Sequence, residues 1–164
     1  MKQTRLLLLM SALCMTFAGT SLAATTHTGH EHKNEQGTAA KTLQLNAGKK
    51  WETDAPLRTA MGEIRQSMAS SLHAIHENKM SAKSYDGLAK QVEGAVGQIV
   101  ASCKLPPAAD AQLHIIVADL LAGAEEMAGK MKEVKRVNGA VKVIGALDNY
   151  GKYFDDAGFR PIEH

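Results

Sequence analysis

Apolar side chains recur every three or four residues along four stretches of the chain, and this periodicity constrains the fold more than any other feature. At 100° per residue, such spacing places the apolar side chains on one stripe of a helix. The clearest stretch follows Thr53 and Asp54, either of which can cap a helix, and runs to about Asn78. Its stripe consists of Leu57, Met61, Ile64, Met68, Leu72 and Ile75.

Two further stretches have the same period and recognisable ends. Ser81 can cap a second helix, whose apolar face extends to Cys103 and which stops at residues 105–107. Pro107 suits the first turn of a third helix, which ends near Gly129. Met131 continues the apolar stripe of this third stretch.

The fourth stretch runs from about Glu133 to Asp156, and no strand or hairpin pattern competes with the four helices. Similar lengths and short connections predict an all-α, antiparallel up-down-up-down four-helix bundle as one domain over residues 42–164. Residues 42–52 are expected to form an ordered, non-helical lead-in that folds over one end of the bundle. Its apolar side chains are Leu43, Leu45 and Trp51.

Glycines interrupt all four predicted helices, at a cost of roughly 1 kcal/mol each relative to alanine where they are exposed. We favour close helix contact across small residues as the explanation. The alternative is that some of them leave room for a ligand. The positions are Gly62, Gly87, Gly94, Gly97, Gly123, Gly139, Gly145 and Gly151.

The first residues read as an export signal. Residues 1–5 are basic and polar, residues 6–19 form an apolar run, and Ser21-Leu22-Ala23 is a cleavage site of small residues. The run is shorter than the roughly 20 residues of a membrane-spanning helix, so we expect cleavage rather than stable anchoring. Residues 1–23 are therefore predicted to be a signal peptide, and the protein to be periplasmic or otherwise exported.

Charge and cysteine content limit the function classes. The chain has 19 Lys and Arg against 17 Asp and Glu side chains, and Lys2 and Arg5 lie in the signal. A balanced mature chain carries no electrostatic footprint for nucleic acid. Removal of Cys14 leaves Cys103 alone. We favour a buried, inert thiol over an intermolecular bridge or a metal ligand.

A polar segment over residues 24–41 has no apolar periodicity and is predicted to be a flexible tail. It carries His27, His30 and His32 beside Glu31. Imidazole is the commonest side-chain ligand for Cu(II), Ni(II) and Zn(II), so this cluster is a candidate metal site, with copper first. A solvated linker indifferent to metal is the equally weighted alternative.

The position of the cleavage bond decides whether the free N-terminus of the tail could form a metal site. Cleavage after Ala24 would give a terminus of Thr25-Thr26-His27, whose amine, amides and imidazole could form a square-planar Cu(II) or Ni(II) site. Cleavage after Ala23 removes that geometry. Ser21, three residues back, favours the earlier bond.

The first predicted helix contributes a second group of candidate ligands. His73 and His76 are three residues apart, and Met80 follows four residues later. Such spacing can serve one ion, and a thioether would suit Cu(I). Rotation around the helix places the two histidines largely toward solvent, so a solvated pair is the favoured alternative. His114 is expected at the boundary of the third apolar face.

Two segments, PLRTAMGEIR and DAQLHIIVADLLAGAEEM, resemble the exported b-type cytochromes of the four-helix-bundle class, whereas LDNYGKYFD in the fourth stretch departs from that family's pattern. The resemblance implies that Met61 occupies the position of the haem-ligating methionine. The histidine position of the fourth helix corresponds to Gly151, and no Cys-x-x-Cys-His is present. We therefore do not expect haem binding by that family's route. KKWETDAPLRTAM also resembles segments of small exported bacterial proteins.

No hydrolytic or phosphate-binding motif occurs in the sequence, so we expect a binding protein rather than an enzyme. Metal capture is the leading hypothesis. The second is a protein-interaction or stress-accessory module in which a face of the bundle docks an unknown protein partner. The third is haem binding through Met61 and an unexpected second ligand.

Overall fold

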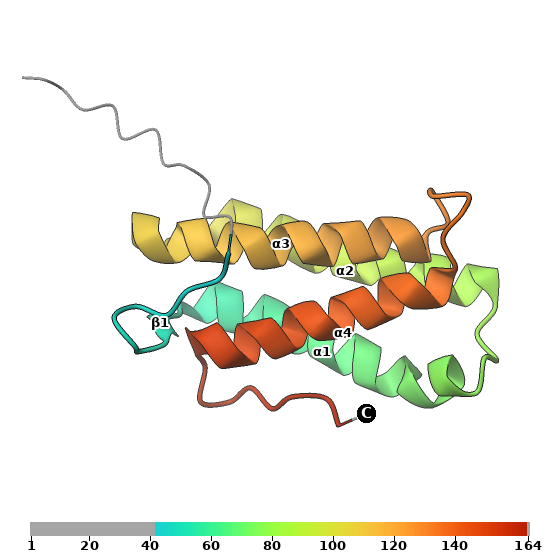
Figure 1. The fold of residues 1–164 in the computed structure, drawn as a ribbon, viewed down its shortest axis with the longest axis horizontal. Helices are drawn as coiled ribbons and strands as arrows, with labels where there is room; N and C mark the ends of the chain where they lie inside the picture. The colour runs from blue at the N-terminus through green and yellow to red at the C-terminus, as the bar shows by residue number, and fades with distance from the viewer. Residues whose placement is uncertain (1–41, 164) are drawn as a thin grey trace, which may run out of the picture. The chain divides into compact units, whose positions relative to one another are not determined.

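The computed structural model describes residues 42–163 (Figure 1). Each helix packs against the next one in the chain, and the first also packs against the fourth. This arrangement is an antiparallel up-down-up-down bundle, so the predicted fold class is confirmed. The helices are α1 (Ala55–His76), α2 (Ala82–Ser102), α3 (Pro107–Met127) and α4 (Arg136–Tyr153).

The predicted signal peptide, residues 1–23, and the predicted tail, residues 24–41, lie outside the described residues. Both assignments therefore stay predictions. Within residues 42–163, none of the helices is long and apolar enough to cross a membrane.

Local sequence signals set the starts of the first three helices. Asp54 caps α1, because its Oδ1 atom accepts the backbone N–H of Leu57 at 2.9 Å. Ser81 caps α2, and its Oγ atom accepts the backbone N–H of Ser84 at 3.1 Å. Pro107 occupies the first turn of α3. Backbone N–H groups in the first turn have no acceptor within the helix, so the N–H that proline lacks costs no hydrogen bond there.

The helix ends follow backbone geometry. Beyond the last residue of α1, Asn78 has a φ of 57°, in the left-handed region that ends a helix. Beyond α3, Gly129 has a φ of 70°. The second helix ends at Ser102, slightly earlier than predicted, so Cys103 is its C-cap and donates its backbone N–H to the Ile99 carbonyl.

The prediction for the fourth helix was too long at both ends. It begins at Arg136 rather than near Glu133, and no side chain caps its start. At its other end the chain leaves the helix to form β2 (Phe154–Asp155), which pairs in parallel with β1 (Trp51–Glu52). The expectation that residues 154 and 155 continue the helix was therefore wrong. The paired residues are about a hundred positions apart, so no local pattern signals them.

The lead-in before β1 is ordered and non-helical, as predicted. Asn46 and Lys49 exchange backbone hydrogen bonds across a tight turn. Leu43 and Trp51 pack against the core, whereas Leu45 is 43% exposed and does not cover the bundle as expected.

The four apolar stripes meet in one core. Met61 and Met68 of the first stripe and Met127 of the third are fully buried, which confirms their predicted packing role. Met131 was expected on the same stripe but is 48% exposed, because α3 ends before it. The largest fully buried side chains are Tyr150, Phe154, Leu57, Met61, Ile64, Met68, Ile116, Leu120, Met127, Leu147, Val92 and Val143.

Close helix contact explains some of the helical glycines. A Cβ atom on Gly139 would lie 2.4 Å from the Gly123 carbonyl oxygen, and one on Gly123 would lie 2.8 Å from the Gly139 carbonyl oxygen. The two glycines therefore let the backbones of α3 and α4 touch, and Gly151 packs on the ring of Phe159 in a similar way. The other five helical positions have open space where a Cβ atom would stand: Gly62, Gly87, Gly94, Gly97 and Gly145.

Candidate functional site

The structure places the predicted bundle ligands around the end of α1. His73 is exposed, with 86% of its side chain accessible, and its Nε2 atom lies 3.3 Å from the Glu77 carboxylate. His76 is also exposed, in agreement with the solvent-facing orientation predicted for both. Met80 is half-buried and packs against the core. Thus both imidazoles are accessible to a metal ion, whereas the Met80 thioether is partly engaged in packing.

The bundle offers no larger group of hard or borderline metal ligands. Among residues 42–163, no three His, Cys, Asp or Glu side chains lie together in an arrangement that could hold a metal. The tail histidines, His27, His30 and His32, lie outside the described residues. Their metal binding stays a prediction from sequence.

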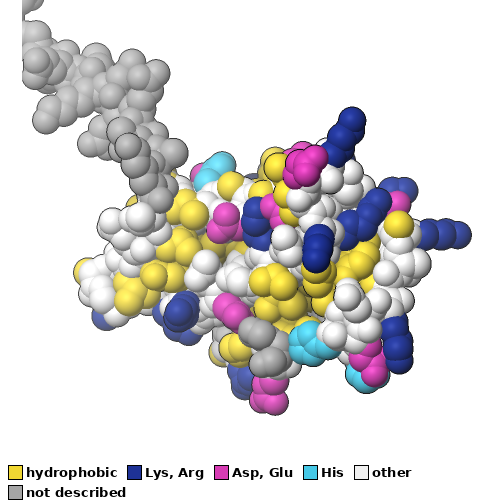
Figure 2. Space-filling model, turned by 45° about the vertical axis from the view of Figure 1, so that its right-hand side comes forward, with side chains coloured by type: hydrophobic (Ala, Val, Ile, Leu, Met, Phe, Trp, Pro, Cys, Tyr) yellow, Lys and Arg dark blue, Asp and Glu magenta, His cyan; other side chains and the backbone are white. Residues whose placement is uncertain are grey.

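A cavity of about 470 Å³ lies between α1 and α4 at the His76 end of the bundle. Leu72, Val137 and Ile144 contribute to its apolar lining, and His76 and Asp148 are its titratable residues. Figure 2 shows hydrophobic side chains beside a histidine on the face of the bundle in view. A volume of this size is typical of small-ligand sites.

The residues that carried the cytochrome resemblance lie inside the fold. Met61 is fully buried in the core. Around Gly151, the ring of Tyr150 stacks on Phe154 at a centroid distance of 5.6 Å and meets Phe159 edge-on at 4.9 Å. The C-terminal segment thus brings an aromatic cluster to the end of α4.

Burial and a hydrogen bond keep the phenol of Tyr150 neutral. Its hydroxyl donates to the Asp156 carboxylate at 2.9 Å, and the side chain is completely buried. Burial first, and then the bond to Asp156, raise the pKa of Tyr150 well above its usual value. The phenol is therefore a structural donor at neutral pH.

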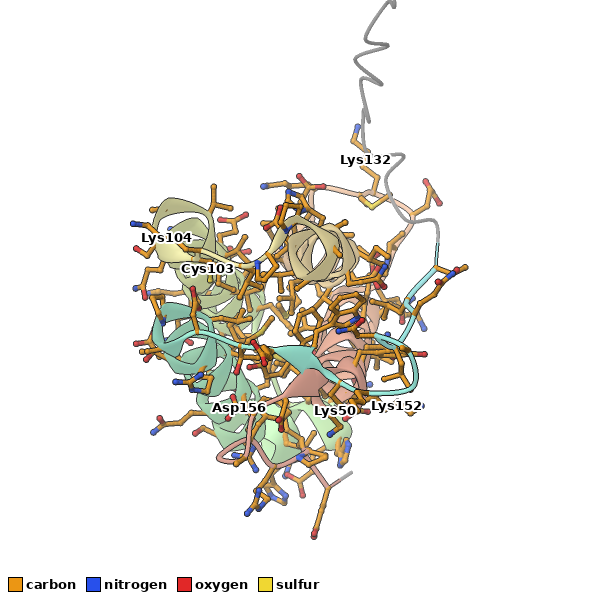
Figure 3. All side chains as sticks on the ribbon, turned by 90° about the vertical axis from the view of Figure 1, so that its left-hand side faces the viewer. Lys50, Cys103, Lys104, Lys132, Lys152 and Asp156 are labelled. Carbon is orange, nitrogen blue, oxygen red and sulfur yellow. The ribbon has the colours of Figure 1, made fainter. Side chains whose placement is uncertain are left out.

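A second polar cluster joins the start of α1 to the connection between α2 and α3, where Figure 3 shows Cys103 and Lys104 next to each other. One oxygen of the Asp54 carboxylate caps the helix, and the other accepts the Lys104 backbone N–H at 2.7 Å. Burial would raise the pKa of Asp54, but the hydrogen bonds from Lys104 and Leu57 outweigh it and lower the pKa below 3.8.

The lone thiol of the bundle is held in its protonated form. Cys103 is half-buried and its Sγ atom donates to Asp54 at 3.4 Å. Burial, followed by the bond to the Asp54 carboxylate, raises the pKa of Cys103 to about 12. Because the thiolate is the nucleophile and metal ligand, this supports the predicted inert role.

His114 lies near this thiol but is bound to its own helix. Both residues line a cavity of about 270 Å³. The exposed imidazole of His114 lies 2.8 Å from the Asp110 carbonyl oxygen and 3.4 Å from the Asp110 carboxylate. This is the boundary position predicted from the sequence.

Sequence reasoning missed the contribution of the C-terminal segment after α4. Phe159 and Ile162 are buried, and the segment lines a cavity with the first half of α1. Arg58, Arg65 and Arg160 meet at this cavity from distant parts of the chain. A spacing of seven residues places Arg58 and Arg65 on one face of a helix, and sequence reasoning could have found these two members of the cluster from that spacing.

Comparisons with known proteins identify no relative: no family model, curated protein or solved structure matches the chain. The described residues form a four-helix bundle, and this architecture alone assigns the chain to no family.

Proposed function

We propose that the protein is an exported, non-enzymatic metal-binding protein, and copper is the leading candidate among the borderline divalent metals. The observation that carries this proposal is the spacing of His27, His30 and His32, three imidazoles within six residues. A short polar segment can bring two or three imidazoles to one Cu(II) ion without a geometry imposed by the fold.

The end of α1 supports a second, weaker site on the bundle, at His73, His76 and Met80. His73 and His76 are exposed, and His76 shares the cavity between α1 and α4 with the Asp148 carboxylate. Two imidazoles on successive turns of a helix can reach the same ion. Glu77 competes for His73, which is one reason to expect weaker binding than in the tail.

Calorimetric titration of the chain beginning at residue 24 with Cu(II) and Zn(II) tests the tail site. Replacing His27, His30 and His32 together by alanine should remove the tightest Cu(II) binding. Replacement of His114 is the matched control, because this exposed histidine belongs to neither proposed site. A wild-type chain that releases no heat of binding, or a tail variant that binds Cu(II) like the wild type, contradicts the proposal.

A second titration separates the bundle site from the tail. In the tail variant, replacing His73 and His76 by alanine should remove any residual weak binding. The mass of the mature N-terminus, measured with metals retained, fixes the cleavage bond. If the mature chain begins at Thr25, His27→Ala alone should abolish the square-planar Cu(II) spectrum.

The cavity between α1 and α4 favours a second candidate function, docking of a protein partner. Val141 on its rim is 62% exposed, and Leu72, Ile75 and Ile144 also line it. Apolar surface that stays open to solvent is a common feature of protein-interaction sites.

Site-specific photocrosslinking in the exporting cell tests this candidate. A photoreactive residue at position 141 should capture a discrete partner. One at position 100 should not, because Val100 is 75% exposed on α2 but does not line this cavity. The candidate fails if position 141 yields no product, or only the products obtained from position 100.

A further inference from the structure

An open cavity of about 790 Å³ lies between the first half of α1 and the segment that follows β2. Arg58, Gly62 and Arg65 line it from one face of the helix, since positions four and seven residues apart share a face. Arg160 lines it from the C-terminal segment. Three guanidinium groups therefore border one space, and we refer to it as the arginine cleft.

Backbone carbonyls hold these arginines in place without neutralising them. Arg58 donates to the Thr53 carbonyl at 2.7 Å, and Arg160 donates to the Ala157 carbonyl at 2.8 Å. Arg65 donates to the carbonyls of Arg160 and Pro161, which ties the C-terminal segment to α1. A carbonyl fixes the position of a guanidinium but leaves its charge and its other N–H donors available.

None of the three arginines forms an ion pair with a carboxylate among residues 42–163. Arg136, at the start of α4, shows the contrasting arrangement, because it is paired with Asp86. Arginine without a carboxylate partner is a strong donor for a bound carboxylate or phosphate, which it can engage with two parallel hydrogen bonds.

Two carboxylates also line the cleft, and neither pairs with an arginine. Asp156 accepts the Tyr150 hydroxyl at 2.9 Å and the Gly158 backbone N–H at 3.1 Å, so both of its oxygens are engaged within its own segment. Asp155 is exposed. Figure 3 shows Asp156 below the strand pair, at the same end of the bundle as Lys50 and Lys152. The cleft therefore keeps an excess of positive charge over the two carboxylates.

Gly62 leaves the helix side of the cleft open. A Cβ atom at this position would meet nothing within 4 Å, so no packing requirement explains the glycine. It stands between Arg58 and Arg65, at the point where a bound molecule would approach the helix backbone. A larger side chain here would project into the cleft without disturbing the core.

We propose that the arginine cleft binds a small organic anion with at least two carboxylate or phosphate groups. Three fixed guanidinium groups can engage several negatively charged groups at once, and the volume suits a small molecule. This site is separate from the proposed metal tail and uses different residues.

Calorimetry on the metal-free chain beginning at residue 24, with citrate in one titration and pyrophosphate in another, tests the cleft and distinguishes carboxylate from phosphate recognition. The paired change Arg58→Gln and Arg160→Gln should weaken binding about tenfold or more. The paired change Lys83→Gln and Lys132→Gln removes the same charge from exposed positions elsewhere and should leave binding within about twofold. Gly62→Leu should abolish binding while the protein melts at the same temperature or higher.

Three results would overturn the proposal. The first is the absence of saturable binding of either anion by the wild-type chain at millimolar concentrations. The second is equal weakening by the lysine pair and the arginine pair, which would indicate attraction by net charge alone. The third is undiminished binding by a folded Gly62→Leu variant. Because the titrations use metal-free protein, none of these outcomes depends on copper binding.

Discussion

Adding one methyl group at Gly139 should destabilise the bundle, although alanine is the better helix former. The new Cβ atom would lie 2.4 Å from the Gly123 carbonyl oxygen and 2.6 Å from the Met127 backbone nitrogen. Ordinary contacts of carbon atoms are about 3.5 Å or longer, so α3 and α4 must separate by roughly 1 Å. No side-chain rotation can relieve a contact with backbone atoms.

Overpacking of this kind costs up to about 3 kcal/mol, and the gain in helix propensity offsets up to about 1 kcal/mol. We therefore expect Gly139→Ala to lower the free energy of unfolding by about 2 kcal/mol and Tm by about 8 °C. Gly94→Ala is the matched control on α2, where a Cβ atom meets nothing within 4 Å. It should raise stability by about 0.5–1 kcal/mol.

Thermal and urea unfolding, followed by circular dichroism, measure both variants against the wild type. A Gly139→Ala variant that melts at or above the wild-type temperature would contradict this prediction. Equal destabilisation by Gly94→Ala would contradict it as well, because the loss would then not come from the contact between α3 and α4.

Three further predictions concern the cluster at Asp54. Asp54→Ala should lower the free energy of unfolding at pH 7 by about 2 kcal/mol, since it removes the cap on Leu57 and the bond to the Lys104 N–H, whereas Asp54→Asn should retain the cap. Folding lowers the pKa of Asp54, so its carboxylate contributes to the free energy of unfolding in full above about pH 4. This contribution is lost as the pH falls through the pKa of Asp54 in the folded protein. Urea titrations at a series of pH values should therefore show this loss of stability in the wild type and not in Asp54→Asn. With Cys14 replaced by serine, alkylation of Cys103 at pH 8 should be about tenfold or more slower in the folded than in the urea-unfolded protein, because folding raises the pKa to about 12 and so lowers the fraction of thiolate. Equal alkylation rates in the two states would contradict this.

Features encoded within a few consecutive residues could be predicted from the sequence. Ser81 and Pro107 mark helix starts, and the stripe from Leu57 to Ile75 lies on the core side of α1, as its period indicates. Each of these signals acts through the backbone or through one helix face, so it can be recognised without knowledge of the rest of the fold.

Features that join distant segments could not be predicted in the same way. Trp51 pairs with Phe154, and Arg65 binds the carbonyl of Arg160, across about a hundred residues. Two-residue strands are too short to show alternation, and a segment such as Gly158-Phe159-Arg160 resembles an ordinary helix stop until its burial is known. The arginine cleft was missed for this reason, because half of it comes from that segment.

The helical glycines also combine a feature that could be predicted from the sequence with one that depends on the fold, and they indicate where the bundle has space. The sequence suggested that small residues serve close contact, but only the fold distinguishes Gly123 and Gly139, which touch, from Gly62, which faces open space. Contact between the glycines holds α4 against α3, and these two helices pack far more extensively than α1 and α4 do. The cavities of about 790 and 470 Å³ both border α1. The two sites proposed on the folded domain, the arginine cleft and the cavity between α1 and α4, therefore both lie beside α1.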